Sequence, residues 1–300
     1  MMPILFIFIA SLFFPGIINV TRSFLSGRKG PGLVQPIWDI LRLFKKGNVI
    51  SNTTSLVFKI APAVQLATMI TAMLLVPFGE RQGFFSFSYD FVFFFYLLAL
   101  GKFFGIIAAM DTGSSFEGMG ASREAHLSML AEPAVFVLFG SLLLFTGKTS
   151  FHEIFLSVAI GPAVHIGIAV MAAFVLFLFM IIENCRVPVD DPRTHLELTM
   201  IHEVMILDNS GFDLGLILYT NALRFALFGA LIANLFIGGM SFWLSPVVFI
   251  AIEILLAVMV GFVESIMARF RMNHNPQFVL SLSSIALLIF IGILLILENN

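Results

Sequence analysis

The residues best suited to chemistry are concentrated in one stretch, residues 183–208, which reads ENCRVPVDDPRTHLELTMIHEVMILD. It holds six of the 18 acidic residues in the chain, together with two histidines. Carboxylates of this kind exchange protons when their surroundings are partly dry. Glu183 directly follows three apolar residues, so its carboxylate should be partly withdrawn from water. The stretch therefore predicts proton chemistry, with a solvated acidic surface as the simpler alternative.

Metal and redox chemistry have little support in this chain. Cys185 is the only cysteine, which excludes a disulfide framework, a CxxC redox pair and a cysteine-ligated iron–sulfur cluster. His202 and Glu203 begin the sequence HEVMI, but the second histidine of a HExxH zinc site is missing. We expect no metal, no cofactor and no catalytic residue here, so electrons, if they matter, would be carried by another subunit.

The composition indicates an integral membrane protein. Of 300 residues, 59% are hydrophobic, 11% are charged and 36 are phenylalanine, and the mean hydropathy is +1.04. A soluble domain of this length could not cover so much apolar surface with polar groups. The formal net charge of −2 also argues against a nucleic-acid partner.

Eight segments are long and apolar enough to cross a bilayer, which takes about 20 residues as a helix. They cover residues 2–20, 56–78, 91–110, 127–146, 156–182, 214–238, 242–263 and 278–297. The first segment lacks the charged start and the cleavage site of a signal peptide, so we expect a helix there. No repeat or linker divides the chain, and we predict one all-α membrane domain over residues 1–300.

The distribution of Lys and Arg predicts the orientation of these helices. Placing the first, third, fifth and seventh loops on one side leaves only Arg81 and Lys148 on the other. The basic residues on the first side are Arg22, Arg28, Lys29, Arg42, Lys45, Lys46, Lys59, Arg123, Arg186, Arg193, Arg269 and Arg271. By the positive-inside rule this side is cytoplasmic, so both termini should lie on the outer side of a cell (inner) membrane.

Two short helices outside the bilayer are also expected. Residues 194–207 alternate acids and histidines with apolar side chains, which predicts a short helix packed on the membrane domain. On it, Glu197 and Glu203 would point in different directions. In the first loop, apolar residues at helical spacing from Val34 to Phe44 predict an amphipathic surface helix. That helix is either a plain lipid anchor or a docking platform for a soluble subunit.

Charged residues also occur within the apolar segments. Glu132 lies about five residues inside the fourth predicted span, whereas Lys102, Arg224 and Glu253 lie in the third, sixth and seventh. A charge at the centre of a membrane helix costs about 2.5–3.5 kcal/mol by insertion scales, which argues for a use. Snorkelling would explain Lys102, and a buried ion pair would explain Arg224 with Glu253. Otherwise these residues line a polar path for protons.

Four segments carry a family resemblance: GRKGPGLVQPIWDILRLFKK, DTGSSFEGMGASREAHLSMLAEP, ENCRVPVDDPRTHLELTMIHEVMILDNSG and ESIMARFRMNHNPQF. In this order they resemble the heel subunit of respiratory complex I, known as the subunit 1 family, and its relatives in membrane-bound group 4 [NiFe] hydrogenases. The resemblance covers nearly the whole chain. VDDPRTHLELTMIHEVM departs from the complex I pattern and is most similar to the corresponding subunit of hydrogenase-4 and formate hydrogenlyase type complexes.

The resemblance implies a subunit that joins a soluble electron-transfer arm to antiporter-like membrane subunits. The implied partners are hydrogenase large and small subunits and an iron–sulfur protein, which would carry the [NiFe] centre and the iron–sulfur clusters. The implied proton-path and coupling residues are Glu183, Arg186, Asp190, Asp191, Glu197, Glu203, Glu124, Glu132, Lys102, Arg224 and Glu253. The implied docking residues of the first loop are Arg28, Lys29, Gln35, Trp38, Asp39 and Arg42.

The sequence leaves three functions open. The first is an anchoring and proton- or sodium-coupling subunit of a group 4 hydrogenase. The second is a quinone-site subunit of a complex I-like NADH dehydrogenase, although the departures from Val189 to Met205 put quinone binding in doubt. The third is an independent secondary transporter, which lacks support because the interrupted, repeated helices of many such proteins are missing.

Overall fold

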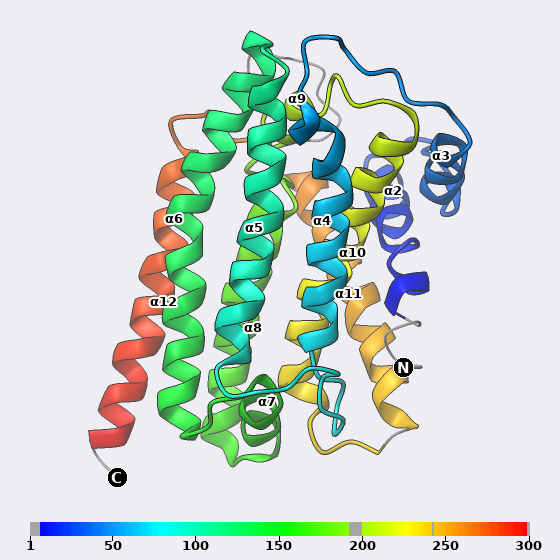
Figure 1. The fold of residues 1–300 in the computed structure, drawn as a ribbon. Helices are drawn as coiled ribbons and strands as arrows, with labels where there is room; N and C mark the ends of the chain where they lie inside the picture. The colour runs from blue at the N-terminus through cyan, green and yellow to red at the C-terminus, as the bar shows by residue number, and fades with distance from the viewer. Residues whose placement is uncertain (1–6, 192–199, 242, 299–300) are drawn as a thin grey trace.

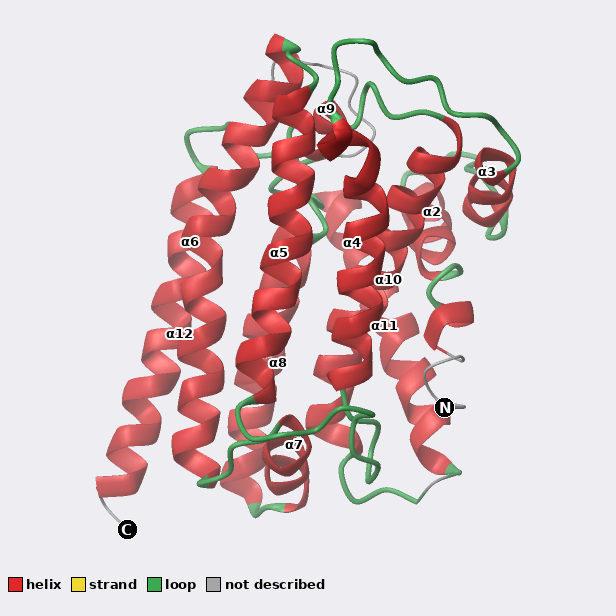
Figure 2. Cartoon of the chain, in the orientation of Figure 1, coloured by secondary structure: helices red, strands yellow, loops and turns green. Residues whose placement is uncertain are grey.

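The computed structural model describes residues 7–191, 200–241 and 243–298 of the chain (Figure 1). Across these ranges the regular structure is helical, apart from one isolated bridge between Phe78 and Arg81 (Figure 2). The helices are α2 (Phe14–Leu25), α3 (Gln35–Phe44), α4 (Leu56–Leu75), α5 (Asp90–Asp111), α6 (Ser115–Thr146), α7 (Phe151–Ile160), α8 (Ala163–Glu183), α9 (His202–Met205), α10 (Gly211–Ile237), α11 (Leu244–Ile266) and α12 (Asn275–Glu298). The all-α prediction is therefore confirmed.

The prediction of eight membrane spans is also confirmed. Within the described ranges, eight helical segments are long and apolar enough to cross a membrane: Ile7–Leu25, which contains α2, and α4, α5, α6, α8, α10, α11 and α12. Figure 1 shows α3 and α9 at one end of the bundle and α7 at the other. We call the first of these the α9 end.

Helix α6 is longer than its predicted span. The apolar pattern placed its start at residue 127, whereas the helix begins at Ser115 and has 32 residues. At 1.5 Å per residue it is about 48 Å long, which exceeds a hydrocarbon layer of about 30 Å. Its polar first turns pack against α9, where Gly120 leaves no room for a side chain beside Val204 and the carbonyl of Ile201. Glu124 therefore lies on a helix and not on a loop.

The fifth predicted span, residues 156–182, consists of two helices. Helix α7 ends at Ile160, and α8 begins at Ala163 after Gly161 and Pro162. Pro162 has no N–H to donate and disfavours a helical conformation at Gly161, whose ψ of 172° is extended. The membrane crossing is therefore α8 alone, and Glu183 is its last residue.

The helix predicted over residues 194–207 can be compared only in part. Residues 192–199 lie outside the described residues, and Glu197 is among them. Helix α9 covers four residues within the rest of this segment. Its first residue is His202, and Glu203 follows.

The amphipathic helix of the first loop is confirmed as α3, but its apolar side is divided. Ile40 is buried, and the ring of Phe44 lies 5.3 Å from that of Phe212 at the start of α10. Trp38 and Leu41, by contrast, remain exposed. One part of the apolar side thus attaches α3 to the bundle, while the other part is left for lipid or a partner.

Helix α10 is the central helix, since it contacts α2, α3, α4, α7, α8 and α11. Small residues let its neighbours come close. At Gly229 the carboxylate of Glu253 on α11 occupies the space that a side chain would take. Helices α10 and α11 are therefore side by side, an arrangement that the sequence did not determine.

Candidate functional site

Lys102 of α5 is the centre of a buried ionic cluster at the α9 end. Its Nζ lies 2.5 Å from Oε1 of Glu183 at the end of α8 and 3.4 Å from Oε1 of Glu124 on α6. The side chains of Lys102, Glu124 and Glu183 are 10%, 8% and 5% exposed, which argues against snorkelling of the lysine into bulk water. We call these three residues the lysine cluster. One ammonium group serves two carboxylates, so a proton or the ammonium itself can shift between them.

Arg224 of α10 reaches the same place. Its Nη1 donates a hydrogen bond of 3.1 Å to the backbone carbonyl of Glu183. This carbonyl belongs to the last turn of α8, where unpaired carbonyls attract a cation. The expected alternative of an ion pair between Arg224 and Glu253 is wrong, because both carboxylate oxygens of Glu253 are buried without a hydrogen-bond partner among the described residues.

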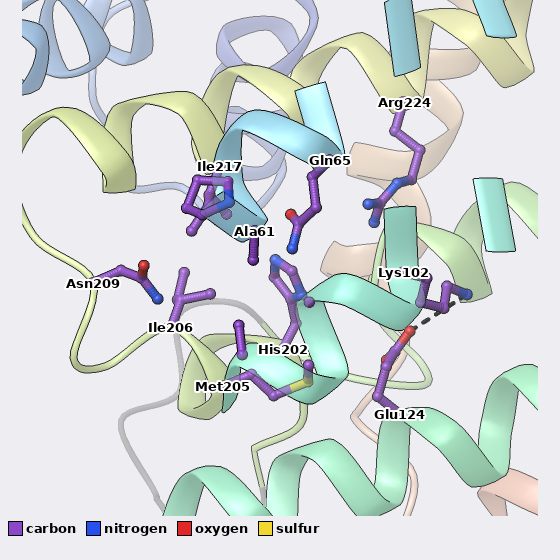
Figure 3. Close-up of a pocket in the computed structure, with 13 residues that line it drawn as sticks. Ala61, Gln65, Lys102, Glu124, His202, Met205, Ile206, Asn209, Ile217 and Arg224 are labelled. Atoms are coloured by element: carbon purple, nitrogen blue, oxygen red, sulfur yellow. Dashed lines mark ion pairs between the residues drawn. The ribbon is translucent and has the colours of Figure 1, made fainter. Parts of the chain in front are cut away.

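A cavity of about 30 Å³ opens beside the lysine cluster (Figure 3). Its polar lining includes Lys102, Glu124, Gln65, His202 and Arg224, from five different helices. A water molecule needs about 10–15 Å³ of such space and two or more polar partners. The cavity can therefore hold one or two waters in contact with the cluster, and we call it the smaller cavity.

Glu132 adds a third carboxylate to this region. It lies two turns beyond Glu124 on α6 and is partly buried. With Lys102 and Glu183 it lines a separate space of about 10 Å³. The acids predicted at the start of the fourth span and at the end of the fifth are thus gathered around one lysine.

A second ionic group lies between α2, α11 and the segment that follows α8. Glu264 of α11 is 3.2 Å from Nη1 of Arg186 and 3.5 Å from Nη1 of Arg22. Arg22 also pairs with Asp191 at 3.4 Å. We call Arg22, Arg186, Asp191 and Glu264 the arginine cluster. The side chain of Glu264 is only 1% exposed, and two guanidinium groups offset the loss of hydration of this carboxylate.

Asp190 holds the chain that leads into α9. Its carboxylate pairs with Arg269 at 3.1 Å and accepts the backbone N–H groups of Ile201 at 3.0 Å and His202 at 3.3 Å. Burial raises the pKa of Asp190, and Arg269 and the backbone donors act in the opposite direction. Asp190 therefore serves as an anchor for the backbone of α9.

The segment between the two clusters contains the single cysteine. The thiol of Cys185 donates to Oε2 of Glu124, with a distance of 3.5 Å between sulfur and oxygen. Burial raises the pKa of the Cys185 thiol well above its ordinary value, and the nearby carboxylates of Glu124 and Asp190 raise it further. The thiol therefore stays protonated and remains a donor to the lysine cluster.

Glu253 does not join either cluster. It is fully buried in α11, against Gly229. It lies 11 residues before Glu264, which is about 16 Å along the helix at 1.5 Å per residue. The predicted path residues are therefore not one contiguous group.

A larger cavity, of about 460 Å³, lies between α2, α3, α10 and the segment after α8. Five predicted residues line it: Gln35, Asp39, Arg186, Asp190 and Glu203. Nine of its 17 lining residues are polar or charged, which gives water partners there, while the lining surface as a whole is mainly apolar. We call it the larger cavity.

The predicted docking residues lie on the surface of the α9 end. Gln35 is partly buried, and the exposed members are Arg28, Lys29, Trp38, Asp39 and Arg42. Gln35 donates to Asp39 at 2.9 Å, so these two also support α3 itself. An exposed tryptophan beside basic groups suits a lipid headgroup or a docked protein.

Sequence reasoning missed the residues whose importance depends on contacts. Arg22 and Arg269 entered only as cytoplasmic charges, and Glu264 was not singled out. Gln65 and Asn221, amides inside apolar helices, gave a weak signal that could have marked them. His202 was considered only as part of a zinc motif.

The arrangement can accept, hold and release protons. Its titratable groups are partly dry, and several of them line two cavities that also contain other polar side chains. Among the described residues, no three His, Cys, Asp or Glu are placed to hold a metal ion.

The chain is similar to known proteins over most of its length. A family model described as NADH dehydrogenase matches residues 1–295. Hydrogenase-4 component C of Escherichia coli (strain K12) is 31% identical over 227 residues, which cover 75% of this chain and 70% of that protein. Formate hydrogenlyase subunit 4 of the same organism is 28% identical over 291 residues, covering 93% of this chain and 92% of that protein.

A solved structure has a similar fold. It is the membrane-bound sulfane sulfur reductase, an archaeal respiratory membrane complex, in which one chain matches with a TM-score of 0.81. The match covers 97% of both chains at 21% sequence identity. At this identity the likeness concerns the fold alone.

Proposed function

The chain belongs to the NADH dehydrogenase family, that of complex I subunit 1, and we propose that it anchors and couples a multi-subunit energy-converting [NiFe] hydrogenase. Its similarity to proteins named hydrogenase-4 component C and formate hydrogenlyase subunit 4 supports this choice within the family. The chain is a multi-pass membrane protein, so it would serve as the membrane part through which ions are moved.

The lysine cluster is the observation that carries the proposal. A purely anchoring helix bundle has no need for Lys102, Glu124 and Glu183 in a dry interior, because a buried ion pair is often less stabilising than apolar residues of similar volume. Retaining such groups beside a cavity with room for water is consistent with proton transfer.

The proposed partners follow from the family and from the surface of the α9 end. Hydrogenase large and small subunits and an iron–sulfur protein would dock near α3, through the exposed residues around Trp38. Because Cys185 is the only cysteine, we place the [NiFe] centre and the iron–sulfur clusters in these partners. Antiporter-like membrane subunits would pack along the bundle and continue the ion path.

The proposed orientation puts the α9 end in the cytoplasm of a cell (inner) membrane, with both termini outside. The loops at this end carry most of the basic residues, including Arg28, Lys29 and Arg42, whereas Arg81 and Lys148 belong to the opposite loops. Cytoplasmic loops carry this excess of positive charge in most membrane proteins.

The contacts of the segment after α8 suggest how a partner would influence the cluster. Asp190 holds the backbone of α9, and Cys185 in the same segment contacts Glu124. A redox event that moves or recharges this segment would therefore change the surroundings of Lys102 through direct contacts. The ammonium group could then favour Glu124 or Glu183, and a proton would be released or taken up.

Purification of the intact complex tests the assignment. We expect a tag at the C-terminus to recover hydrogenase subunits, nickel and hydrogen evolution with a reduced viologen. A nickel-free complex that carries flavin and reduces quinone would contradict the proposal and would support the quinone-site alternative.

Glu183→Gln tests the coupling role. The change keeps the size of the side chain but removes its charge, so ion movement per turnover should fall at least about tenfold while the subunits still co-purify. Ion movement would be measured in liposomes, with protons and sodium assayed separately. Glu80→Gln, a change at an exposed glutamate, is the matched control. Unchanged ion movement in the Glu183 variant would remove Glu183 from the mechanism.

The larger cavity favours one alternative function, that of a quinone-site subunit in a complex I-like NADH dehydrogenase. Its volume of about 460 Å³ falls within the range of small-molecule sites, about 300–1,000 Å³. Its lining surface is mainly apolar, with polar groups such as His202 and Asn221 among the lining residues. A photoreactive quinone analogue that labels the segment around Cys185 would support this alternative.

A further inference from the structure

His202 is the one described residue that lines both the smaller and the larger cavity. The smaller cavity is also lined by Lys102, Glu124 and Arg224, and the larger one by Asp190 and by Asp39 of α3. His202 therefore stands where water in one cavity comes closest, through a shared residue, to water in the other.

The hydrogen bonds around His202 separate its backbone from its ring. The backbone N–H is held by the carboxylate of Asp190 at 3.3 Å. The ring is held by a different residue, Asn221 of α10, whose Nδ2 lies 2.8 Å from Nε2 of His202. The position of α9 is therefore maintained without the imidazole, so the ring can be replaced while its anchor stays.

The surroundings of the ring favour the neutral form of histidine. Burial, helped by the positive charges of Arg224 and Lys102, lowers the pKa of His202 to about 3. The amide of Asn221 can hydrogen-bond either tautomer of the neutral ring, through its nitrogen or its oxygen. Among the described residues that line the two cavities, the other charged groups are Glu124, Asp39, Arg186, Asp190 and Glu203.

The other end of the Asn221 amide points to water on the side of the larger cavity. Oδ1 of Asn221 is buried and has no hydrogen-bond partner among the described residues, and Asn221 lines the larger cavity. A buried amide oxygen without a partner is unfavourable. A water molecule in this cavity could donate a hydrogen bond to it, next to His202.

We propose that His202 passes protons between the larger cavity and the lysine cluster, with Asn221 as the residue that positions its ring. This role rests on the proposed ion-coupling function and adds a proton entrance to it. In the transfer, one ring nitrogen gains a proton from water in one cavity. The second ring nitrogen loses its proton to water or a carboxylate in the opposite cavity. The imidazole is neutral before and after, and Asn221 must release Nε2 for the step to occur.

Two variants of the intact complex test this proposal. His202→Gln keeps a hydrogen-bonding side chain but cannot be protonated, so turnover and ion movement should fall at least about tenfold. In His202→Ala, turnover and ion movement should fall by a similar factor. Added imidazole, which has room in the larger cavity, should restore the turnover of this variant measured in detergent. Rescue by imidazole is a result that a merely structural role would not give. His274→Gln, at an exposed histidine that bonds Gln277, is the matched control.

The outcomes separate this proposal from the proposed function. If Glu183→Gln loses coupling while His202→Gln keeps it, the relay role of His202 is overturned and the lysine cluster still couples. If neither variant loses coupling, the coupling role of Glu183 in the proposed function fails, and the relay fails with it. If His202→Gln loses activity but imidazole has no effect on His202→Ala, the ring acts through packing and the relay role is overturned. Loss in both His202 variants with imidazole rescue supports the proposal.

Discussion

The lysine cluster and the arginine cluster lie at the same end of the protein, yet they hold charge in different ways. In the arginine cluster, Glu264 meets two guanidinium groups at 3.2 and 3.5 Å. In the lysine cluster, one ammonium serves both Glu124 and Glu183, and a cavity of about 30 Å³ opens beside them. The short segment after α8 contacts both.

This difference indicates a structural role for the arginine cluster and a role in proton transfer for the lysine cluster. Guanidinium groups stay charged and bind carboxylates in a fixed planar geometry, which suits a connection between α2, α11 and the segment after α8. An ammonium is a compact point charge on a flexible stem, so it can move between two acids. We therefore expect substitutions in the arginine cluster to change mainly stability, and those in the lysine cluster to change coupling as well.

Lys102→Met should have the largest effect, because it leaves two buried carboxylates without their shared cation. Removing one partner of a buried ion pair is unfavourable by about 3–5 kcal/mol. We expect that loss of stability together with loss of ion movement. Denaturant titration of the complex in mild detergent would measure the first and liposome assays the second. Lys102→Arg, which keeps the charge, is the control, and a Met variant with native stability would show that the lysine is dispensable.

Glu264→Gln tests most directly whether the arginine cluster affects stability alone. It removes one charge from the arginine cluster while keeping the side-chain shape, so stability should fall by about 2–3 kcal/mol, the upper range for hydrogen bonds to charged groups. The number of ions moved per turnover should not change. Denaturant titration and liposome assays would measure the two quantities. A loss of ion movement as large as that in Glu183→Gln would show that the arginine cluster also takes part in proton transfer.

Gly229→Ala tests Glu253, which belongs to neither cluster. A Cβ at this position would overlap the carboxylate of Glu253, and overpacking of this kind lowers stability by about 1–3 kcal/mol. Combining it with Glu253→Ala removes the overlap, so the two effects should be non-additive in a double-mutant cycle. Additive effects in denaturant titrations would mean that the two residues are not in contact.

The smallest effect is a pH dependence from His202. Its pKa is lowered to about 3 in the folded protein, so below the ordinary value the unfolded chain binds a proton that the folded chain does not. Stability should therefore be greatest above pH 6.5 and fall on acidification, by at most about 1.4 kcal/mol per pH unit. His202→Gln should reduce this slope between pH 6.5 and 5.5, and the comparison of the two proteins isolates the contribution of the histidine. An equal slope in both proteins would contradict the lowered pKa.

Part of the fold could be predicted because apolar length is a local property. Eight spans follow from the requirement for about 20 apolar residues in a helix that crosses the bilayer. The first turns of α6 could not be found this way, since residues 115–126 are polar and contain glycine, and α9 covers them only after folding. The break between α7 and α8, in contrast, was readable from Gly161 and Pro162.

The candidate site shows the same division. Lys102, Glu132 and Glu183 could be named in advance because charges in apolar segments are costly and therefore informative. Their association could not, since Lys102 and Glu183 are 81 positions apart. Glu264 and Arg269 were not singled out because a charge at a helix end has no local feature that distinguishes a buried partner from a solvated one.

The sequence by itself determined that this is a membrane protein, where its helices cross, and which residues carry charge into apolar surroundings. These properties depend on the transfer of each segment from water, which adds up along the chain. Only the tertiary structure decided which acid meets the lysine, which meets the arginines, and that Glu253 meets neither. It also decided that His202 stands between two cavities, because such contacts depend on how helices far apart in the chain pack against one another.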